Sequence, residues 1–180
     1  MKNRPRVAPV KARSELPAEH QAVADAVVKQ YGEIRGPWGI LLHSPKLAER
    51  VLPLVPFFHK ESIVEGRLRS IAILTAVREL DADYVWSAQA AAARRNGVSE
   101  EHIELLRTKG EPDKLPAEAR EIVAYARQLM RARRVEQATF DALKNRHGTQ
   151  WLVEMTACIG YFGMVSGIAN AFEIPAPEKQ

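Results

Sequence analysis

Residues 65–89 read EGRLRSIAILTAVRELDADYVWSAQ, and this stretch decides the fold class. The apolar side chains of its first sixteen residues form one broad band at helical spacing: Leu68, Ile71, Ala72, Leu74 and Val77. Such a band predicts a helix that lies in a hydrophobic core. Asp81 or Asp83 can cap a second helix, which Gly97 closes. The stretch therefore predicts two consecutive helices joined by a short turn.

The rest of the chain carries helical signals as well. No run of alternating polar and β-branched residues is long enough for a sheet. A helix from Pro45 should kink or break near Leu52, because Pro53 and Pro56 each lack a backbone donor. Ser99 caps another short helix. The further helices are expected at 17–31, 116–133 and 137–147, with a long apolar helix after Gly148. The sequence predicts an all-α helical bundle.

The charge distribution separates an N-terminal arm from the body of the chain. The 180 residues hold 26 Lys and Arg against 22 Asp and Glu, and five of the basic residues precede the first acid, Glu15. Without those five, 21 basic residues face 22 acidic ones, which argues against a nucleic-acid-binding surface. We expect a mobile basic arm at 1–16, a single domain at 17–174 and a tail at 175–180.

Cysteine usage and hydropathy bear on the compartment. Cys158 is the only cysteine, so no intramolecular disulfide can form, and the charged, proline-containing N-terminus shows no signal peptide. We expect a cytoplasmic protein. The eighteen residues from Met155 to Phe172 carry no charge, yet polar residues interrupt them and no basic cluster flanks them, so we expect a buried helix and no membrane span. Gly160, Gly163 and Gly167 in that helix predict close contact with another helix, in the same subunit or across an oligomer interface.

Four segments together carry a family resemblance. They are GPWGILLHSPKLAERVL, RLRSIAILTAVRELDADYVWSAQ, GVSEEHIELLR and GYFGMVSGIANAFEIPAP. Over roughly residues 17–177 the chain resembles the carboxymuconolactone decarboxylase family, whose relatives include the alkyl hydroperoxidase D-like proteins. The resemblance implies an all-α fold of the alkyl hydroperoxidase D-like type, assembly as trimers or hexamers, and an active site between helices near a subunit interface.

The resemblance also shows which reactive groups this chain lacks. Members like the peroxidase branch carry Cys-x-x-Cys, a His four residues later and a Glu one helix earlier, which together activate a thiolate. In this chain the Glu position holds Ser70, the two Cys positions hold Ala82 and Val85, and the His position holds Gln89. Members that read Tyr-Glu-Trp-x-x-His keep an acid/base pair, whereas here only the aromatic residues remain. The sequence predicts a family scaffold without either set of catalytic groups.

No catalytic residue can be assigned from the sequence, but six residues are candidates for ligand binding. Arg67 and Arg69 flank the helix that carries Ser70, and a guanidinium suits a carboxylate ligand; of the two we select Arg67. The aromatic residues can line a pocket, and His43 lies in a matched segment. The candidates are Ser70, Tyr84, Gln89, His43, Arg67 and Trp86. Cys158 is expected to be a buried structural thiol, and the five histidines show no metal-ligand spacing.

Three functions remain open on these grounds. The first is a carboxymuconolactone decarboxylase-like protein that binds a small organic molecule, a carboxylate or lactone being the candidate class, and acts as a lyase if it is catalytic. The second is an inactive member that serves as an oligomeric binding or scaffolding protein. The third is an alkyl hydroperoxidase D-like peroxidase, ranked last because the dithiol is missing. No cofactor, metal, nucleic acid or membrane is expected among the partners.

Overall fold

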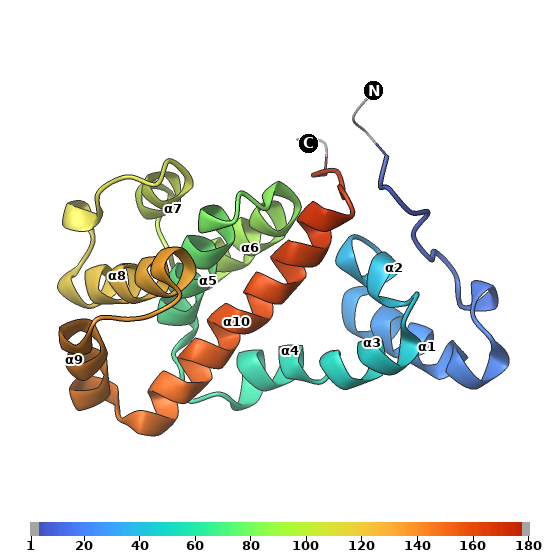
Figure 1. The fold of residues 1–180 in the computed structure, drawn as a ribbon, viewed down its shortest axis with the longest axis horizontal. Helices are drawn as coiled ribbons and strands as arrows, with labels where there is room; N and C mark the ends of the chain where they lie inside the picture. Colours follow the sequence, from blue (N-terminus) through green and yellow to red (C-terminus); the bar gives the residue numbers. More distant parts are fainter. Residues whose placement is uncertain (1–3, 178–180) are drawn as a thin grey trace. The chain divides into compact units, whose positions relative to one another are not determined.

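The computed structural model describes residues 4–177, and every regular element in that range is helical, which confirms the all-α prediction. The outermost residues of the predicted arm (1–3) and tail (178–180) lie outside the described residues. In chain order the elements are η1 (Arg13–Glu15), η2 (Ala18–His20), α1 (Gln21–Tyr31), α2 (Pro37–Leu41), α3 (Pro45–Val51), α4 (Leu54–Pro56), η3 (Phe57–Glu61), α5 (Gly66–Glu79), α6 (Asp83–Arg95), α7 (Glu100–Arg107), η4 (Pro112–Lys114), α8 (Ala117–Ala132), α9 (Gln137–His147) and α10 (Thr149–Ala171) (Figure 1).

One compact unit comprises the chain as far as Glu61, together with Ile168–Pro175. Its helix α1 ends before Gly32, whose φ of 82° is a left-handed conformation that glycine adopts without steric cost. The predicted break near Leu52 is confirmed, because α3 ends at Val51 and Pro53 precedes the short helix α4. The π turn η3 follows at once. The prolines thus divide what would otherwise be one long helix.

The described part of the N-terminal arm lies against this first unit. The amide of Val10 donates to the carbonyl of Gly39 over 2.9 Å, and the amide of Arg6 donates to the carbonyl of Phe172 over 2.9 Å. A Cβ on Gly39 would lie 2.8 Å from the Cβ of Pro9, so this approach depends on a glycine. The described part of the arm therefore packs against its own chain, and its mobility stays a prediction.

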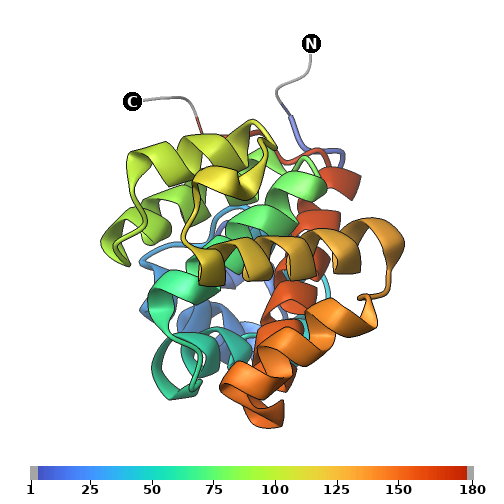
Figure 2. The same ribbon diagram turned by 90° about the vertical axis from the view of Figure 1, so that its left-hand side faces the viewer.

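Helix α5 is the centre of the second unit, which contains Ser62–Gly167. All ten residues from Leu68 to Val77 are buried. Helices α6, α7 and α8 pack against α5, and Figure 2 shows α8 crossing in front of it. The buried hydroxyl of Thr75 donates to the carbonyl of Ile71 over 2.8 Å, so it lies in the core without an unsatisfied donor. The sequence predicted one buried face, whereas the structure covers this part of α5 on all sides.

The turn between α5 and α6 differs from the prediction. The N-cap residue of α6 is Ala82, and no side chain caps the helix, so the prediction that Asp81 or Asp83 does so is wrong. The reason is competition from Arg78, whose guanidinium binds the carboxylates of Asp81 and Asp83 at 2.7 and 3.1 Å. The predicted cap of α7 is confirmed, since the hydroxyl of Ser99 accepts a hydrogen bond from the amide of His102.

Helix α10 is the long apolar helix predicted after Gly148. It is long and apolar enough to cross a membrane, a test that buried core helices also pass, and 44% of its most apolar window is buried. A Cβ on Gly160 or Gly167 would meet no atom within 4 Å, and one on Gly163 would lie 4.0 Å from Leu80 and Met130. The prediction that these glycines allow close contact with another helix of the same chain is therefore wrong. Contact with another subunit stays a prediction.

Candidate functional site

Ser70 forms the clearest polar contact among the predicted site residues. It is 5% exposed on α5, and its Oγ accepts a hydrogen bond of 2.9 Å from Nδ2 of Asn96. Asn96 is the residue that follows α6. It lies seven positions after Gln89, which corresponds to about 10 Å along a helix axis. The structure therefore joins Ser70 to the C-terminal end of α6, a partner that no motif in the sequence indicated.

Tyr84, Trp86 and Gln89 all lie on α6, with different exposures. Trp86 is 9% exposed, and the guanidinium of Arg78 lies 5.8 Å from the centre of its ring, as in a cation–π contact. Tyr84 and Gln89 are half-buried. Arg78 is itself held by two aspartates, so the indole belongs to a packed corner between α5 and α6. Binding of a ligand by these three side chains stays a prediction.

His43 and Arg67 take no part in the contact between Arg78 and Trp86. His43 belongs to the first unit, is exposed, and has its Nε2 2.9 Å from the carbonyl oxygen of Ala8 in the arm. Arg67 is half-buried in the first turn of α5. The contact of His43 is structural, because it ties the arm to its own unit.

Arg69 is the buried arginine of this region, although the sequence favoured Arg67. It is 6% exposed, and its Nη1 donates to the carbonyl of Val64 over 2.7 Å. Its Nε is buried without a hydrogen-bond partner. Burial lowers the pKa of this guanidinium, and the Cys158 thiol and Glu65 carboxylate partly offset the shift. The helical band did not indicate Arg69, because position 69 lies on the far side of the helix from that band, and it is buried because α5 is covered on all sides.

Cys158 on α10 is the thiol close to this guanidinium. It is 1% exposed, and desolvation raises its pKa to about 12, although the charge of Arg69 acts in the opposite direction. Nucleophilic and peroxidatic cysteines need a thiolate near neutral pH. Cys158 therefore has the environment of a structural residue.

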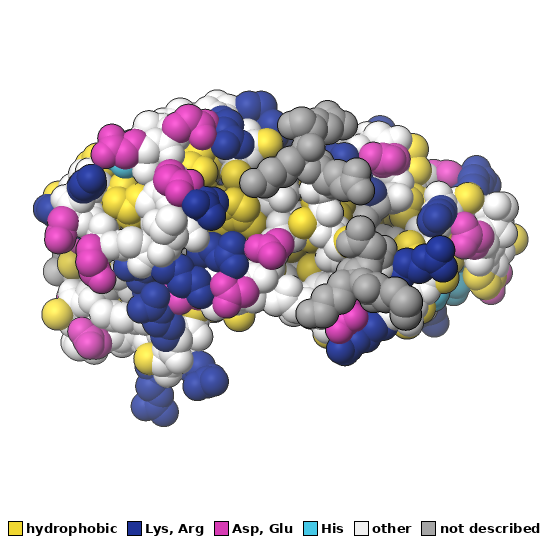
Figure 3. All heavy atoms as spheres, turned by 90° about the horizontal axis from the view of Figure 1, so that it is seen from above, with side chains coloured by type: hydrophobic (Ala, Val, Ile, Leu, Met, Phe, Trp, Pro, Cys, Tyr) yellow, Lys and Arg dark blue, Asp and Glu magenta, His cyan; other side chains and the backbone are white. Residues whose placement is uncertain are grey.

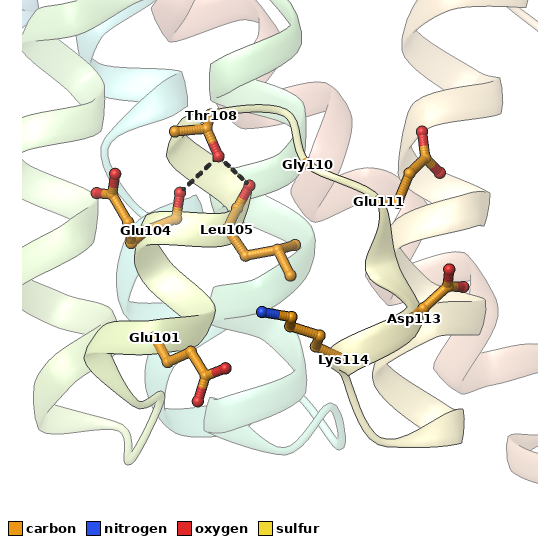
Figure 4. A pocket seen from close by; sticks show the side chains of 8 residues that line it. All are labelled: Glu101, Glu104, Leu105, Thr108, Gly110, Glu111, Asp113 and Lys114. Atoms are coloured by element: carbon orange, nitrogen blue, oxygen red, sulfur yellow. Dashed lines mark hydrogen bonds between the residues drawn. The ribbon is translucent and has the colours of Figure 1, made fainter.

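Two surface pockets lie in the second unit. One, of about 570 Å³, is formed by α7 and the segment after it, and Figure 4 shows Leu105 and Lys114 among acidic side chains. Its other lining residues are Glu101, Glu104, Thr108, Gly110, Glu111 and Asp113. The other, of about 440 Å³, lies between α8, α9 and α10 and is lined mainly by apolar side chains, with Tyr125 donating or accepting at Thr156 over 2.6 Å. Within residues 4–177, no cluster of three metal-ligating side chains occurs.

Charged side chains of both signs share the surface. Figure 3 shows Lys and Arg side chains gathered on part of the face that it draws, with Asp and Glu side chains among and around them. Exposed charges of the described residues also form short pairs, such as Arg107 with Glu104 at 2.6 Å. The two signs lie close together on this face, as the nearly neutral body of the sequence would produce.

Two solved structures resemble this chain. A peroxidase-related protein from Ralstonia eutropha, described as an alkylhydroperoxidase AhpD core, has a TM-score of 0.77 at 17% identity, covering 97% of this chain and 93% of its own. A putative antioxidant defence protein AhpD of unknown function from Agrobacterium tumefaciens has a TM-score of 0.68 at 16% identity, covering 81% and 100%. No family model and no curated protein matches the sequence. The fold is that of the AhpD core.

Within this AhpD-like fold, the positions that the family resemblance assigns to two thiols are aliphatic and buried. Ala82 is 0% exposed directly before α6, and Val85 is 4% exposed in its first turn. The polar groups of the region lie instead around the start of α5 and the end of α6, at Arg69, Ser70 and Asn96. We take this cluster, called the Arg69 cluster below, as the candidate site.

Proposed function

We propose that this AhpD-like chain binds a small organic molecule, in the manner of a carboxymuconolactone decarboxylase-like protein, and does not use thiol peroxidase chemistry. The observation that carries the proposal is the Arg69 cluster, three polar side chains on the rim of an otherwise apolar core. Ser70 and Asn96 pair with each other, but Nε of Arg69 is buried without a partner, which costs free energy. A ligand that pairs with Arg69 would offset that cost.

The groups in the cluster suit binding and orientation. Ser70 and Asn96 offer hydrogen bonds, and Arg69 offers positive charge, but none of them exchanges a proton readily near neutral pH. A lyase step at this site would therefore depend on stabilising developing negative charge. Thiol peroxidase turnover is disfavoured because burial holds the pKa of Cys158 at about 12.

A second candidate, an oligomeric scaffold, is favoured by one face of α10. Its exposed residues between Val153 and Gly167 recur every three or four positions and are small or apolar: Val153, Ala157, Gly160, Met164 and Gly167. This spacing follows the 3.5-residue repeat of packed helices, and small side chains allow two backbones to approach. We propose a homo-oligomer that uses this face, located in the cytoplasm.

Peroxide turnover and ligand capture test the proposed function. The wild-type protein and Cys158→Ser are incubated with hydrogen peroxide and dithiothreitol, and peroxide consumption is followed. We expect both proteins to match the reductant-only control. Peroxide consumption that the Cys158→Ser variant loses would overturn the proposal in favour of a peroxidase.

For ligand capture, the protein is purified without denaturation, examined by native mass spectrometry, and then screened by thermal shift against small organic acids, lactones and neutral aromatic compounds. We expect at least one of these to raise the unfolding temperature, as a ligand that binds only the folded state must. A chain that responds to none of them and carries no bound molecule would favour the scaffold.

A further inference from the structure

The free edge of the Arg69 guanidinium is the starting observation. A guanidinium can bind a carboxylate in a bidentate manner through Nε and one terminal nitrogen. Three arginines among the described residues do so: Arg131 donates from Nε and Nη2 to Glu79 at 2.7 Å each, and Arg107 donates from the same two atoms to Glu104 at 2.7 and 2.6 Å. Arg94 binds Glu100 through the same edge. Arg69 uses its other nitrogen, Nη1, for Val64, and its Nε has no partner. The edge that binds carboxylates elsewhere in the chain is thus not used by one here.

The surroundings of that edge favour an anion. Arg69 lies in the first turn of α5, and the N-cap residue of that helix, Glu65, makes no side-chain cap. The first turn of a helix presents amide groups and the positive end of the helix dipole, which attract anions. The hydroxyl of Ser70 accepts from Asn96 and still has its own proton to donate. Several donors therefore lie near one helix end.

Gly66 places no side chain beside the free edge. A Cβ on Gly66 would lie 3.5 Å from Nη2 of Arg69 and 3.5 Å from Oδ1 of Asn96. Gly66 and Asn96 are both half-buried, so solvent reaches the rim of the cluster, whereas Arg69 is 6% exposed. A small anion can approach at this rim, where a larger side chain at position 66 would stand in its path.

The charge of Arg69 sets the class of ligand. Among the described residues no carboxylate forms a salt bridge with it, and Glu65, which acts on it electrostatically, is exposed. An isolated buried charge is unfavourable until it is paired. One guanidinium balances one negative charge, so a monocarboxylate fits, whereas a phosphate dianion would leave a net negative charge next to an apolar core.

We propose that the Nε–Nη2 edge of Arg69 binds the carboxylate of a small organic monoacid at the N-terminus of α5. This inference rests on the proposed function, because it names the class of molecule that the chain binds. Asn96 and Ser70 position the ligand, and Gly66 keeps the approach open.

Nuclear magnetic resonance on the arginine side chains tests the proposal directly. The Nε–H signal of Arg69 is assigned by its loss in Arg69→Lys, and the protein is titrated with sodium benzoate, with the neutral isostere benzamide and with inorganic phosphate. We expect benzoate to shift the Arg69 Nε–H signal saturably, and benzamide to leave it in place. Arg69→Lys should weaken benzoate binding about tenfold or more, because lysine keeps the charge but loses the planar edge.

Gly66→Ala separates binding from folding. The added methyl group makes ordinary contacts of 3.5 Å, and alanine is a better helix former than glycine, so the variant should fold at least as well as the wild type. It should nevertheless weaken benzoate binding, because the methyl group occupies the approach to Nη2. Arg95→Gln removes the same charge from an exposed site on α6 and is the matched control, with benzoate affinity within about twofold of wild type.

The results of these titrations distinguish failure of the further inference from failure of the proposed function. A signal of Arg69 that benzoate does not move, or benzoate affinity equal in wild type and Gly66→Ala, overturns the inference. A phosphate shift as large as that of benzoate overturns the assignment to a monocarboxylate. A neutral compound that stabilises the protein without moving the Arg69 signal would overturn the inference and leave the proposed function standing, whereas failure of every compound would count against both.

Discussion

The free energy of unfolding should fall at alkaline pH because the protein contains the buried thiol of Cys158. The size of the fall follows from the burial of that thiol. Desolvation raises the pKa of Cys158 from the ordinary 9.0 to about 12. The folded state therefore keeps the proton over a range in which the unfolded state has lost it. The unfolded state binds fewer protons there, so the free energy of unfolding falls as pH rises from about 9 towards about 12.

The magnitude can be worked out from the two pKa values. Three pKa units correspond to about 4 kcal/mol when the fall is complete, at 1.36 kcal/mol per unit. At about pH 10 the fall is already about 1.4 kcal/mol, which urea titration resolves. The same shift means that only about one thiol in 10⁵ is ionised at neutral pH, so the pKa that lowers alkaline stability also keeps the thiol unreactive.

The assay compares urea denaturation of the wild type and Cys158→Ala at about pH 8 and about pH 10. Tyrosine and lysine titration affects both proteins, so the difference between them isolates the thiol. We expect Cys158→Ala to be less stable by about 1 kcal/mol at the lower pH, because it loses buried volume. It should become equal to or more stable than the wild type at the higher pH. A stability difference between wild type and Cys158→Ala that is the same at both pH values would refute the desolvation argument. A fast reaction of native Cys158 with iodoacetamide near pH 7 would refute the conclusion that the thiol is unreactive.

Three further predictions follow from other contacts. Glu79→Gln should lower the free energy of unfolding by about 2 kcal/mol, because the Glu79 carboxylate is 7% exposed and pairs with Arg131 and Arg127; Glu104→Gln, in an exposed pair, is the control and should show no measurable change in urea. Ser70→Ala should cost about 1 kcal/mol through loss of the acceptor for Asn96, while Ser87→Ala at an exposed site should not, and equal effects would contradict a specific role for that hydrogen bond. Met164→Glu should reduce the mass measured by light scattering if α10 forms the oligomer interface, whereas Val28→Glu, at an exposed apolar residue of α1, should leave it unchanged; an unaltered mass in both variants would exclude this face.

Helical periodicity and punctuation were enough to predict most of the fold. Gly32 and Gly97 end α1 and the segment after α6 with φ of 82° and 80°, and such positions can be recognised because the residue type itself decides the conformation. Pro53 likewise identified the break after α3. The Asp caps failed for the opposite reason: Arg78 competes for Asp81 and Asp83 through a tertiary contact, and local propensity does not include such contacts.

The candidate site was less predictable, because its members are brought together by packing. Ser70 was selected because it occupies the Glu position of the family motif that the chain resembles. Its observed partner, Asn96, is 26 positions away and belongs to no motif. Arg67 was preferred to Arg69 on the sequence. At about 100° per residue, position 69 lies on the far side of the helix from the apolar band, so the band did not indicate Arg69. Arg69 is buried because α5 is covered on all sides from Leu68 to Val77, and a single apolar band does not contain that information.

The proposed ligand binding at the Arg69 cluster would oppose thiol chemistry at Cys158. A guanidinium beside a cysteine lowers the pKa of the thiol, and Arg69 does act on Cys158 in that direction, but desolvation is the larger effect. A carboxylate bound to Arg69 would neutralise the charge that opposes desolvation and would raise the thiol pKa further. Occupation of the proposed site would therefore make Cys158 less reactive. The chain has aliphatic residues at Ala82 and Val85 and a single cysteine, so it has no dithiol whose activation this effect would oppose.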